Sequence, residues 1–528
     1  MDLATAFSWT AERFPNRRAV GGAEPMTYRQ WDARTNQVAR ALADLGVRRG
    51  DRVAFSLAGG EPLASLHLAA QKLGATSVPL STRFGAEELG YCLEDAGVSL
   101  LVTDSTTSDR AGEALSLKGL TLGRAHLGDL DQVDGEAADL ARIAAEQPDG
   151  VLPPSADETD ISVMLYTSGT TGRPKGVPRT HSAEHSAAVA HLVQTQHRPG
   201  EVTLGVMPMF HTMGLRSLVA SVVAGGTWVP QAHFDVAESL ELIERERVGA
   251  LYLVPTIYWS LLRSGELGRL TSVRRLAYAG ATMTPSLAEQ LTDALRPEVF
   301  VNHFGSTEIY TFTISPDVAT KPGCAGRAGV FSRVRLVDPT PGASPEDVVA
   351  QGEQGQVAVS MSSPEAFGGY WNRPDADAKS IRDGWYFTGD LATADEDGDL
   401  WVAGRVDDMI NSGGENIYPD EIEAALVRCP AVSDVVVVGM PDDRWGHAVT
   451  AFVVPADGLQ PDDAVTQVLE YARGSSGLPS LKRPKRVVIV PAIPKSAVGK
   501  ILRRTLTAGE YTALAQGVAE RNRETPGR

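Results

Sequence analysis

The N-terminal part of the chain alternates helix-like segments with short apolar strands. Apolar residues recur every three or four positions between Thr27 and Gly46, two residue types that often cap helices, so a helix is expected there. A short apolar strand over 53–55 follows, and the pattern repeats with a helix over 63–73 and a strand over 77–80. This alternation predicts an α/β fold, in which a sheet carries helices on its faces.

The signal weakens and then returns further along the chain. Residues 105–158 have little periodicity, so they are expected to form surface elements and a connector. Buried strands separated by helices are predicted again at 251–254, 275–279 and 299–301.

The pattern changes near residue 406. A glycine-rich loop and a helix that begins at Pro419 come next, and strands are predicted at 435–438, 449–454 and 487–490. This segment is long enough to fold alone. We therefore predict a large N-terminal domain of α/β subdomains, 1–405, and a small α+β C-terminal domain, 406–528.

Charge and cysteine content limit the partners and the compartment. The 528 residues include 49 Lys and Arg against 66 Asp and Glu, and the net charge of −17 excludes binding of nucleic acid or an anionic membrane over the whole surface. The three cysteines form no C-x-x-C pair, which argues against a disulfide framework and a cysteine zinc site. No segment has the apolar character of a signal peptide or a membrane span. A cytoplasmic protein without a membrane partner is expected.

The stretch 166–176 carries the strongest chemical signal. It follows an apolar strand and combines glycines, which let the backbone approach a ligand, with hydroxyl donors and the cation of Lys175. These features suit a bound polyphosphate. The stretch is not a Walker A loop, because Gly176 follows the lysine where Ser or Thr would be required.

This stretch resembles the phosphate loop of the adenylate-forming superfamily, which includes acyl- and aryl-CoA synthetases, peptide-synthetase adenylation domains and luciferases. Four further motifs of that family follow in the expected order, at 304–308, 386–390, 404–408 and 494–500. The resemblance covers nearly the whole chain. It implies a mobile C-terminal domain and a two-step reaction: a carboxylic acid and ATP give an acyl-adenylate and pyrophosphate, and the acyl group then passes to a thiol. ATP, Mg²⁺ and CoA are the implied cofactors.

The resemblance also assigns roles to single residues. Phe304 is suited to stacking on adenine, Glu308 is an oxygen ligand suited to Mg²⁺, and Asp390 can accept the ribose hydroxyls. Lys500 is the lysine that reaches the reacting anions, and its charge offsets their repulsion. The catalytic residues so implied are Lys500, Glu308, Thr307 and His211. The ATP and AMP site so implied comprises Thr167, Ser168, Gly169, Thr170, Thr171, Gly172, Lys175, Gly280, Ala281, His303, Phe304, Gly305, Asp390 and Arg405.

The thiol acceptor is predicted to be CoA, with a carrier-protein phosphopantetheine as the alternative. A run without acidic residues, 482–504, supplies positive charge for the CoA phosphates. Leu481 departs from the family pattern, since the 4-chlorobenzoate enzymes have an aromatic residue there. The CoA-binding residues expected are Arg83, Gly414, Trp445, Arg483 and Lys485. Asp407 matches the hinge between the two poses of the small domain.

The acid is predicted to be a substituted benzoate. His211 stands where amino-acid-activating relatives place an Asp, which argues against an amino acid. Small residues on the pocket floor and bulky ones on its walls suit a flat ring, and the C-terminal half resembles benzoate-type CoA ligases. The pocket residues expected are His211, Met213, Tyr258, Gly280, His303, Gly305 and Tyr310. A medium-chain, alicyclic or other acyl-CoA synthetase is the alternative, a silent binding protein is disfavoured by the intact motifs, and a homodimer is left open.

Overall fold

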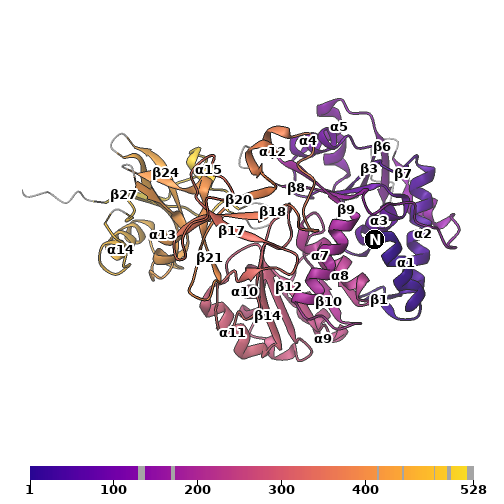
Figure 1. The fold of residues 1–528 in the computed structure, drawn as a ribbon, viewed down its shortest axis with the longest axis horizontal. Coiled ribbons are helices and arrows are strands. Elements are labelled where there is room, and N and C mark those ends of the chain that lie inside the picture. Colours follow the sequence, from indigo (N-terminus) through magenta and orange to yellow (C-terminus); the bar gives the residue numbers. More distant parts are fainter. Residues whose placement is uncertain are drawn as a thin grey trace, which may run out of the picture. The chain divides into compact units, whose positions relative to one another are not determined.

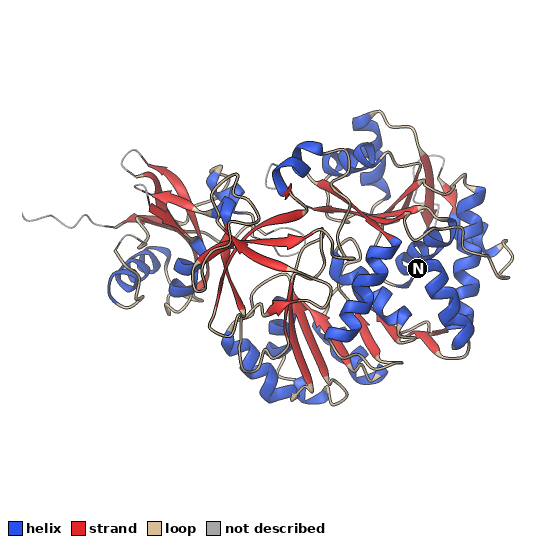
Figure 2. Ribbon diagram, viewed as in Figure 1, coloured by secondary structure: helices blue, strands red, loops and turns tan. Residues whose placement is uncertain are grey.

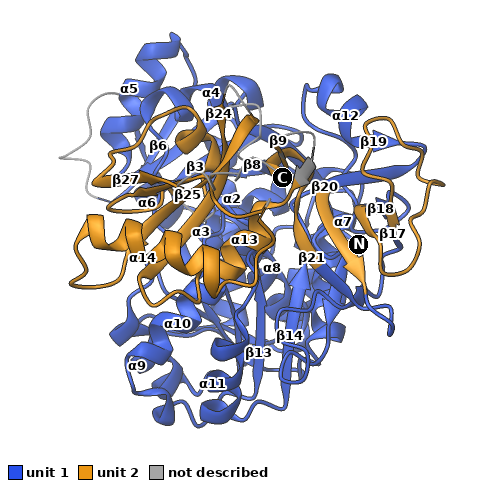
Figure 3. Ribbon diagram, turned by 90° about the vertical axis from the view of Figure 1, so that its left-hand side faces the viewer, with its two compact units in different colours: residues 1–335, 358–388, 395–401 blue, residues 336–357, 389–394, 402–528 orange. Residues whose placement is uncertain are grey.

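The computed structural model describes residues 1–128, 137–167, 173–412, 415–442, 445–480, 482–495 and 501–519. The chain packs into two compact units, which Figure 3 colours separately. The larger unit comprises Met1–Arg335, Ala358–Thr388 and Asp395–Trp401, and the smaller comprises Leu336–Val357, Gly389–Ala394 and Val402–Arg528. This division does not test the predicted boundary between residues 405 and 406, which stays a prediction.

The larger unit contains two sheets, and the first has seven strands. Its order is β7-β6-β5-β3-β4-β8-β9, and all neighbours are parallel except β8 and β9, which are antiparallel. Figure 1 labels several of these strands. The strands are β3 (Arg52–Ser56), β4 (Thr76–Pro79), β5 (Leu100–Asp104), β6 (Gly123–Leu127), β7 (Ala138–Asp139), β8 (Ile161–Thr167) and β9 (Lys175–Thr180).

The second sheet has nine strands in the order β16-β15-β14-β13-β12-β10-β11-β1-β2. Its centre is parallel, and antiparallel strands flank it at both edges. The strands are β1 (Arg18–Val20), β2 (Met26–Thr27), β10 (Val202–Gly205), β11 (Thr227–Pro230), β12 (Ala250–Leu253), β13 (Arg275–Ala279), β14 (Val299–Phe304), β15 (Thr313–Ser315) and β16 (Arg327–Ala328).

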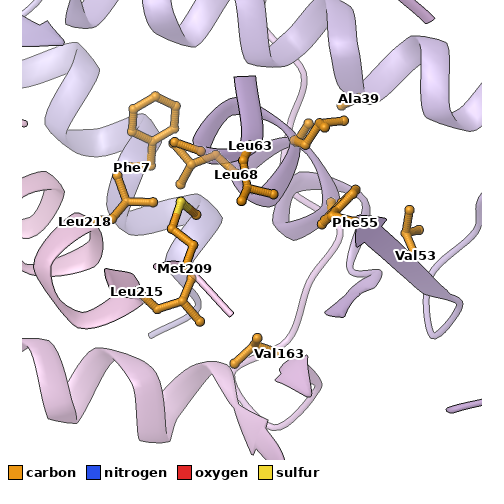
Figure 4. Close-up of a cluster of buried hydrophobic side chains, with 14 of the residues drawn as sticks. Phe7, Ala39, Val53, Phe55, Leu63, Leu68, Val163, Met209, Leu215 and Leu218 are labelled. Atoms are coloured by element: carbon orange, nitrogen blue, oxygen red, sulfur yellow. The ribbon is translucent and has the colours of Figure 1, made fainter. Parts of the chain in front are cut away.

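A shared hydrophobic core joins these two sheets through helices. Val53 and Phe55 of the first sheet, Phe7 of the first helix and Leu215 of a later helix belong to one cluster of buried residues, part of which Figure 4 shows. The helices that contribute to it are α1 (Leu3–Arg13), α2 (Tyr28–Asp44), α3 (Glu61–Leu73), α6 (Leu140–Ala145), α7 (His181–Gln194) and α8 (Thr212–Val223). At this core, apolar side chains of both sheets are removed from water together.

Other helices cover the remaining faces of the two sheets (Figure 2). Two pack on the first sheet, namely α4 (Ala86–Ala96) and α5 (Ser108–Lys118). Three pack on the second, namely α9 (Val236–Glu246), α10 (Pro255–Arg263) and α11 (Pro285–Leu295), with the short helix η2 (Leu267–Arg269) beside them. Helices thus lie on both faces of each sheet, as the alternating sequence pattern predicts.

The smaller unit is built on a six-stranded sheet. The order is β23-β22-β25-β26-β27, with β24 also paired to β25. Alternate residues of β24 and β25 enter two separate cores, one under α13 and α14 and the other under α15. The elements are β22 (Ile410–Ser412), β23 (Glu415–Ile417), α13 (Pro419–Leu426), β24 (Val432–Asp442), β25 (Gly446–Pro455), α14 (Pro461–Gly474), β26 (Arg486–Ile489), α15 (Arg503–Thr507) and β27 (Ala515–Val518).

The chain passes between the units within four strands: β17 (Val334–Val337), β18 (Gln354–Ser360), β20 (Trp385–Ala394) and β21 (Leu400–Arg405). Between β18 and β20 come α12 (Pro374–Ser380) and β19 (Ile381–Arg382), and a 3₁₀ turn, η3 (Val406–Asp408), follows β21. All three cysteines are buried free thiols. Among the described residues, none of the helices has the length and apolarity that a membrane crossing requires.

Candidate active site

The two ends of the predicted phosphate loop lie side by side. Thr167, the last residue of β8, is the antiparallel register partner of Lys175, the first residue of β9. The loop is therefore a hairpin connection that is closed at its base. The predicted loop residues between these two strand ends lie outside the described residues: Ser168, Gly169, Thr170, Thr171 and Gly172.

Lys175 lies near the carboxylate predicted to bind a metal, and one tyrosine contacts both groups. The ammonium nitrogen of Lys175 is 3.9 Å from the centre of the Tyr370 ring. The Tyr370 hydroxyl donates a hydrogen bond to Glu308 Oε1 at 2.6 Å, and both residues are buried. Burial and then the negative charge of Glu308 raise the pKa of Tyr370, so the hydroxyl keeps the proton that it donates.

Glu308 stands on a tight turn that follows β14. A Cβ atom at Gly305 would lie 2.1 Å from the carbonyl oxygen of Tyr310, so a side chain does not fit there unless the backbone moves. The turn is closed by a hydrogen bond at 2.9 Å from the Ser306 N–H to the Ile309 carbonyl. The glycine of this motif is therefore required by the backbone of the turn itself.

A buried arginine holds the same turn from the other side. The guanidinium of Arg179 donates to the carbonyl oxygens of Thr307, Glu308 and Glu365 at 3.2, 3.2 and 2.9 Å. It also forms a buried ion pair with Glu184, which balances its charge. Because buried carbonyl oxygens need donors, Arg179 fixes the backbone that carries Thr307 and Glu308.

The carboxyl ends of β13 and β14 bring the predicted nucleotide and acid residues together. The last residue of β13 is the register partner of His303 in β14. Gly280 and Ala281 follow directly after β13, and Phe304 and Gly305 follow His303. Ligands of open α/β sheets commonly bind at the carboxyl ends of parallel strands, so this strand edge is a suitable place for a ligand.

Aromatic packing orients the ring predicted to stack on adenine. Phe304 packs edge-on against Phe312, with ring centres 5.2 Å apart and an angle of 89°. Phe312 also packs against Tyr386 at 6.3 Å. The ring of Phe367 contacts both Tyr386 and Tyr370. These aromatic contacts extend from Phe304 to the tyrosine that binds Glu308.

The predicted acid-pocket residues do not all share one environment. His211 caps the N-terminus of α8, where its Nδ1 accepts from the Met213 N–H at 3.4 Å, and burial lowers its pKa to about 4. Met213 is buried in the core of the second sheet. Tyr258 is buried there too, and its hydroxyl donates to the carbonyl oxygens of Leu251 and Ala277 at 3.1 and 3.0 Å. The assignment of these side chains to pocket walls stays a prediction.

The predicted ribose residues form an ion pair in the smaller unit. Arg405 donates to Asp390 Oδ1 at 2.8 Å. The neighbouring glycines have positive φ angles, 78° at Gly389 and 135° at Gly404, which other residues adopt only with strain. A charge-assisted hydrogen bond of this kind holds the carboxylate in one orientation.

The predicted hinge residue, Asp407, lies beside a charge cluster. Its neighbour Asp408 forms an ion pair at 3.4 Å with Arg503, which stands three positions after the predicted catalytic lysine. Arg503 also binds Asp420 at 2.9 Å and Glu423 at 2.7 Å. One guanidinium thus faces three carboxylates, and it ties the start of α15 to the 3₁₀ turn and to α13.

The predicted CoA residues are partly assembled. The ammonium of Lys485 is 5.6 Å from the centre of the Trp445 ring, and its pKa is lowered by burial and then by the charge of Arg483. Arg83 belongs to the larger unit, where it is exposed after β4. Two further predicted residues, Gly414 and Lys500, lie outside the described residues.

One cluster of three acids in the described part of the chain could in principle hold a cation: Asp395, Asp397 and Asp399. The ammonium of Lys321 lies 3.1, 2.6 and 2.6 Å from their oxygens. These hydrogen bonds raise the pKa of Lys321. The lysine thus supplies the positive charge of this cluster, which is separate from Glu308.

Comparison with known proteins identifies the family. A model described as AMP-binding enzyme matches residues 7–371, and a second, described as AMP-binding enzyme C-terminal domain, matches residues 421–500. The chain belongs to the AMP-binding enzyme family. The predicted family and the predicted α/β fold class are thereby confirmed, as is the prediction of an AMP-forming acyl- or aryl-CoA synthetase.

Similar AMP-binding enzymes differ in the acids after which they are named. A feruloyl-CoA synthase of Amycolatopsis sp is 36% identical over 94% of this chain and 97% of its own. A 4-chlorobenzoate–CoA ligase of Arthrobacter sp is 33% identical over 96% and 95%. The long-chain-fatty-acid–CoA ligase FadD13 of Mycobacterium tuberculosis is 35% identical over 92% and 93%. The crystal structure of ATP-bound MatB from Rhodopseudomonas palustris superposes with a TM-score of 0.84 at 28% identity, over 96% and 99%.

Three residues of this AMP-binding enzyme escaped the sequence analysis: Arg179, Tyr370 and Arg503. Arg179 and Tyr370 bind the Glu308 turn from segments more than a hundred positions and some sixty positions away in sequence, respectively. The one available signal concerned Arg503, which lies three positions after the 494–500 motif.

Replacing Tyr370 with Phe is expected to weaken the binding of Mg²⁺ without unfolding the protein. The change keeps the ring that Lys175 contacts but removes the hydroxyl that orients Glu308. Loss of such a supporting hydrogen bond lowers metal affinity by roughly tenfold or more. The measurement is the Mg²⁺ concentration that gives half-maximal ATP–pyrophosphate exchange. Tyr28→Phe is the matched control, because it removes an equally buried hydroxyl bond in another core. An unchanged Mg²⁺ requirement in Tyr370→Phe contradicts the prediction.

The cluster around Arg503 is expected to make the stability of the smaller unit depend on pH. Burial raises the pKa of Glu423 from 4.5 to about 7, although Arg503 opposes this shift. The folded state therefore holds the proton more tightly than the unfolded state. The stabilisation is fully present below pH 4.5 and is lost as the pH rises through about 7. Its full size is at most roughly 3 kcal/mol.

Glu423→Gln removes the titrating group and should flatten this pH dependence. The measurement is the free energy of unfolding in urea at several pH values between 5 and 8. Glu421→Gln is the control, because Glu421 lies on the same helix but pairs with Lys482 at the surface. Equal slopes for the wild type and Glu423→Gln would show that Glu423 does not titrate in this window.

Proposed function

We propose that this AMP-binding enzyme is an ATP-dependent aryl-CoA ligase that acts on a substituted benzoate or a related aromatic acid. The observation that supports the chemistry most directly is the contact of Tyr370 with both Lys175 and Glu308, next to the strand ends that carry Phe304 and Gly305. A cation, a carboxylate and an aromatic ring are thereby gathered where the family binds a nucleotide. Two relatives named for aromatic acids, which align over nearly the whole chain, support the aryl assignment.

The first half-reaction joins the acid to AMP. A carboxylate oxygen attacks the α-phosphorus of ATP, and the bond to pyrophosphate breaks. Lys175 and Thr167, at the base of the hairpin loop, would bind the phosphates, and Phe304 would support the adenine. The Glu308 carboxylate fits Mg²⁺ because it is a hard oxygen donor, fixed by Tyr370. When bound, Mg²⁺ would offset charge on the phosphate oxygens.

The second half-reaction transfers the acyl group to a thiol. The thiol sulfur loses its proton and attacks the carbonyl carbon of the acyl-adenylate, and AMP leaves. CoA is the proposed acceptor because Trp445, Arg483 and Lys485 combine an aromatic face with positive charge. Arg83 and Gly414 are proposed to complete its site. Asp407 is proposed as the hinge that lets the small domain serve both half-reactions.

A fatty acid is the competing substrate class, because the relative FadD13 is named for long-chain fatty acids. The test is a panel of substituted benzoates, cinnamates, an alicyclic acid and octanoate, assayed for ATP–pyrophosphate exchange and for CoA thioester formation. We expect an aromatic acid to exceed octanoate in kcat/KM by at least roughly tenfold, equivalent to about 1.4 kcal/mol. A preference for octanoate or the alicyclic acid would overturn the aryl assignment. Transfer of the acyl group only to a holo-carrier protein would overturn the assignment of CoA as the acceptor.

Lys500→Ala is expected to separate the two half-reactions. A positioned cation should matter most where two anions meet, so acid activation should fall roughly 10²-fold or more. Thioester formation from presynthesised aryl-adenylate should be nearly unchanged. Lys118→Ala, which removes a surface lysine paired with Glu94, is the control. If both half-reactions fall equally, Lys500 does not serve adenylation alone.

A further inference from the structure

A group of buried imidazole rings lies next to the proposed acid site. His303, at the end of β14, faces His191 of α7 with ring centres 5.3 Å apart. The ring of Tyr252, on β12, lies 5.4 Å from His303 and 4.8 Å from His191. His197 adds a third imidazole 5.3 Å from His191. We call His191, His197, His303 and Tyr252 the histidine cluster.

The histidine cluster adjoins the turn that carries Gly305. Arg216, on α8, donates to Thr311 Oγ1 at 2.6 Å and lies 3.5 Å from the carbonyl oxygen of Tyr310. That same carbonyl oxygen is the atom that a side chain at Gly305 would meet. The positive charge of Arg216 acts on both His191 and His303. The cluster thus adjoins the strand edge proposed to bind the acid, because His303 directly precedes Phe304 and Gly305.

The charges in this region already balance. Arg216 pairs with Glu365 at 3.8 Å, and both side chains are almost fully buried. Burial is the main cause that lowers the pKa values of His191 and His303 well below 6.5, and the positive charge of Arg216 lowers them further. Burial lowers the pKa of His197 to about 4. All three imidazoles are therefore neutral at pH 7. Among the residues that the structure describes here, an ionised substituent would find no unbalanced positive charge.

Some ring nitrogens of the histidine cluster have no hydrogen-bond partner among the described residues. Both nitrogens of His303 and the Nδ1 of His191 are buried and make no hydrogen bond to any residue that the structure describes. His197 differs, because its Nδ1 is bonded to Thr195 Oγ1 at 2.7 Å. A neutral imidazole has one donor and one acceptor nitrogen. A partner that both donates and accepts, such as a hydroxyl group, matches two such rings side by side.

We infer that the acid activated by this enzyme carries a neutral hydroxyl group on its ring, and that His303 and His191 bind this hydroxyl. The inference rests on the proposed aryl-CoA ligase function and narrows its substrate class. A halogen or methyl group would leave the imidazole nitrogens unpaired. A second carboxylate would bring a charge into a region whose charges are already balanced. A hydroxyl satisfies the cluster without either cost.

The experiment compares acids that differ in one ring substituent at one position. The series is benzoate with its 2-, 3- and 4-hydroxy, chloro, methyl and carboxy derivatives, together with cinnamate and 4-hydroxycinnamate. In the wild type, one hydroxy acid should exceed both its unsubstituted parent and its chloro analogue in kcat/KM by at least roughly tenfold, because a site built to bond a hydroxyl rejects analogues that lack it. The matching carboxy derivative should be the poorest substrate of its set.

His303→Leu and His191→Leu should each bring the hydroxy-to-parent ratio close to one. His191 is not among the predicted ATP-site residues, so His191→Leu should also leave the KM for ATP unchanged. His67→Leu is the matched control, because His67 is equally buried and its nitrogens also have no partner in the described part of the chain, but it lies on α3 in another core. That variant should keep the wild-type ratio. If a leucine variant does not fold, the wild-type series alone decides.

The outcomes distinguish a failure of the hydroxyl inference from a failure of the proposed aryl-CoA ligase function. If benzoate or a chlorobenzoate is turned over as well as every hydroxy acid, the aryl-CoA ligase stands and the hydroxyl inference is overturned. A hydroxy-to-parent ratio in kcat/KM that stays at the wild-type value in both His303→Leu and His191→Leu also overturns the hydroxyl inference. If no aromatic acid is a substrate while a fatty acid is, both proposals fail.

Discussion

The candidate active site depends on one buried guanidinium. Arg179 is fully enclosed, and a single residue supplies hydrogen bonds to carbonyl oxygens of two separate chain segments, the turn at 307–308 and Glu365. Arg179 lies in β9 and Glu184 lies in α7, so their ion pair links this strand to this helix. Removing either charged partner would leave the other buried and unpaired, which commonly costs about 3–5 kcal/mol. The turn that carries Glu308 therefore has its orientation set by the strand that also carries Lys175.

Local sequence signals predicted much of this fold. Thr27 forms a capping box with Gln30 at the start of α2, as helix-capping chemistry leads one to expect. The predicted strand over 275–279 coincides with β13, because a run of apolar residues between polar turns identifies a buried strand. The segment 105–158 was harder, since β6 and β7 lie at a sheet edge, where burial imposes a weaker pattern.

The residues of the candidate active site also differ in whether a local sequence signal could identify them. Glu308, Asp390 and Lys175 belong to motifs whose residues are contiguous, so a resemblance could find them. Arg179 and Tyr370 act through contacts between distant segments, and spacing along one segment carries no record of such contacts. The charge cluster of the smaller unit is similar, because Arg503 meets acids that lie about eighty to ninety-five positions earlier.

The hairpin pairing of β8 with β9 limits how the phosphate loop can change. Side chains on adjacent residues of a strand point to opposite faces, so a slip of one position in this pairing would turn Lys175 away from Tyr370. Residues could be added to or removed from the loop while the paired strand ends stay in place. The register of β8 against β9 can therefore change only in steps of two residues if Lys175 is to keep facing Tyr370. The number of residues between Thr167 and Lys175 is not limited by the sheet in this way, and it is limited instead by the nucleotide that the loop is proposed to bind.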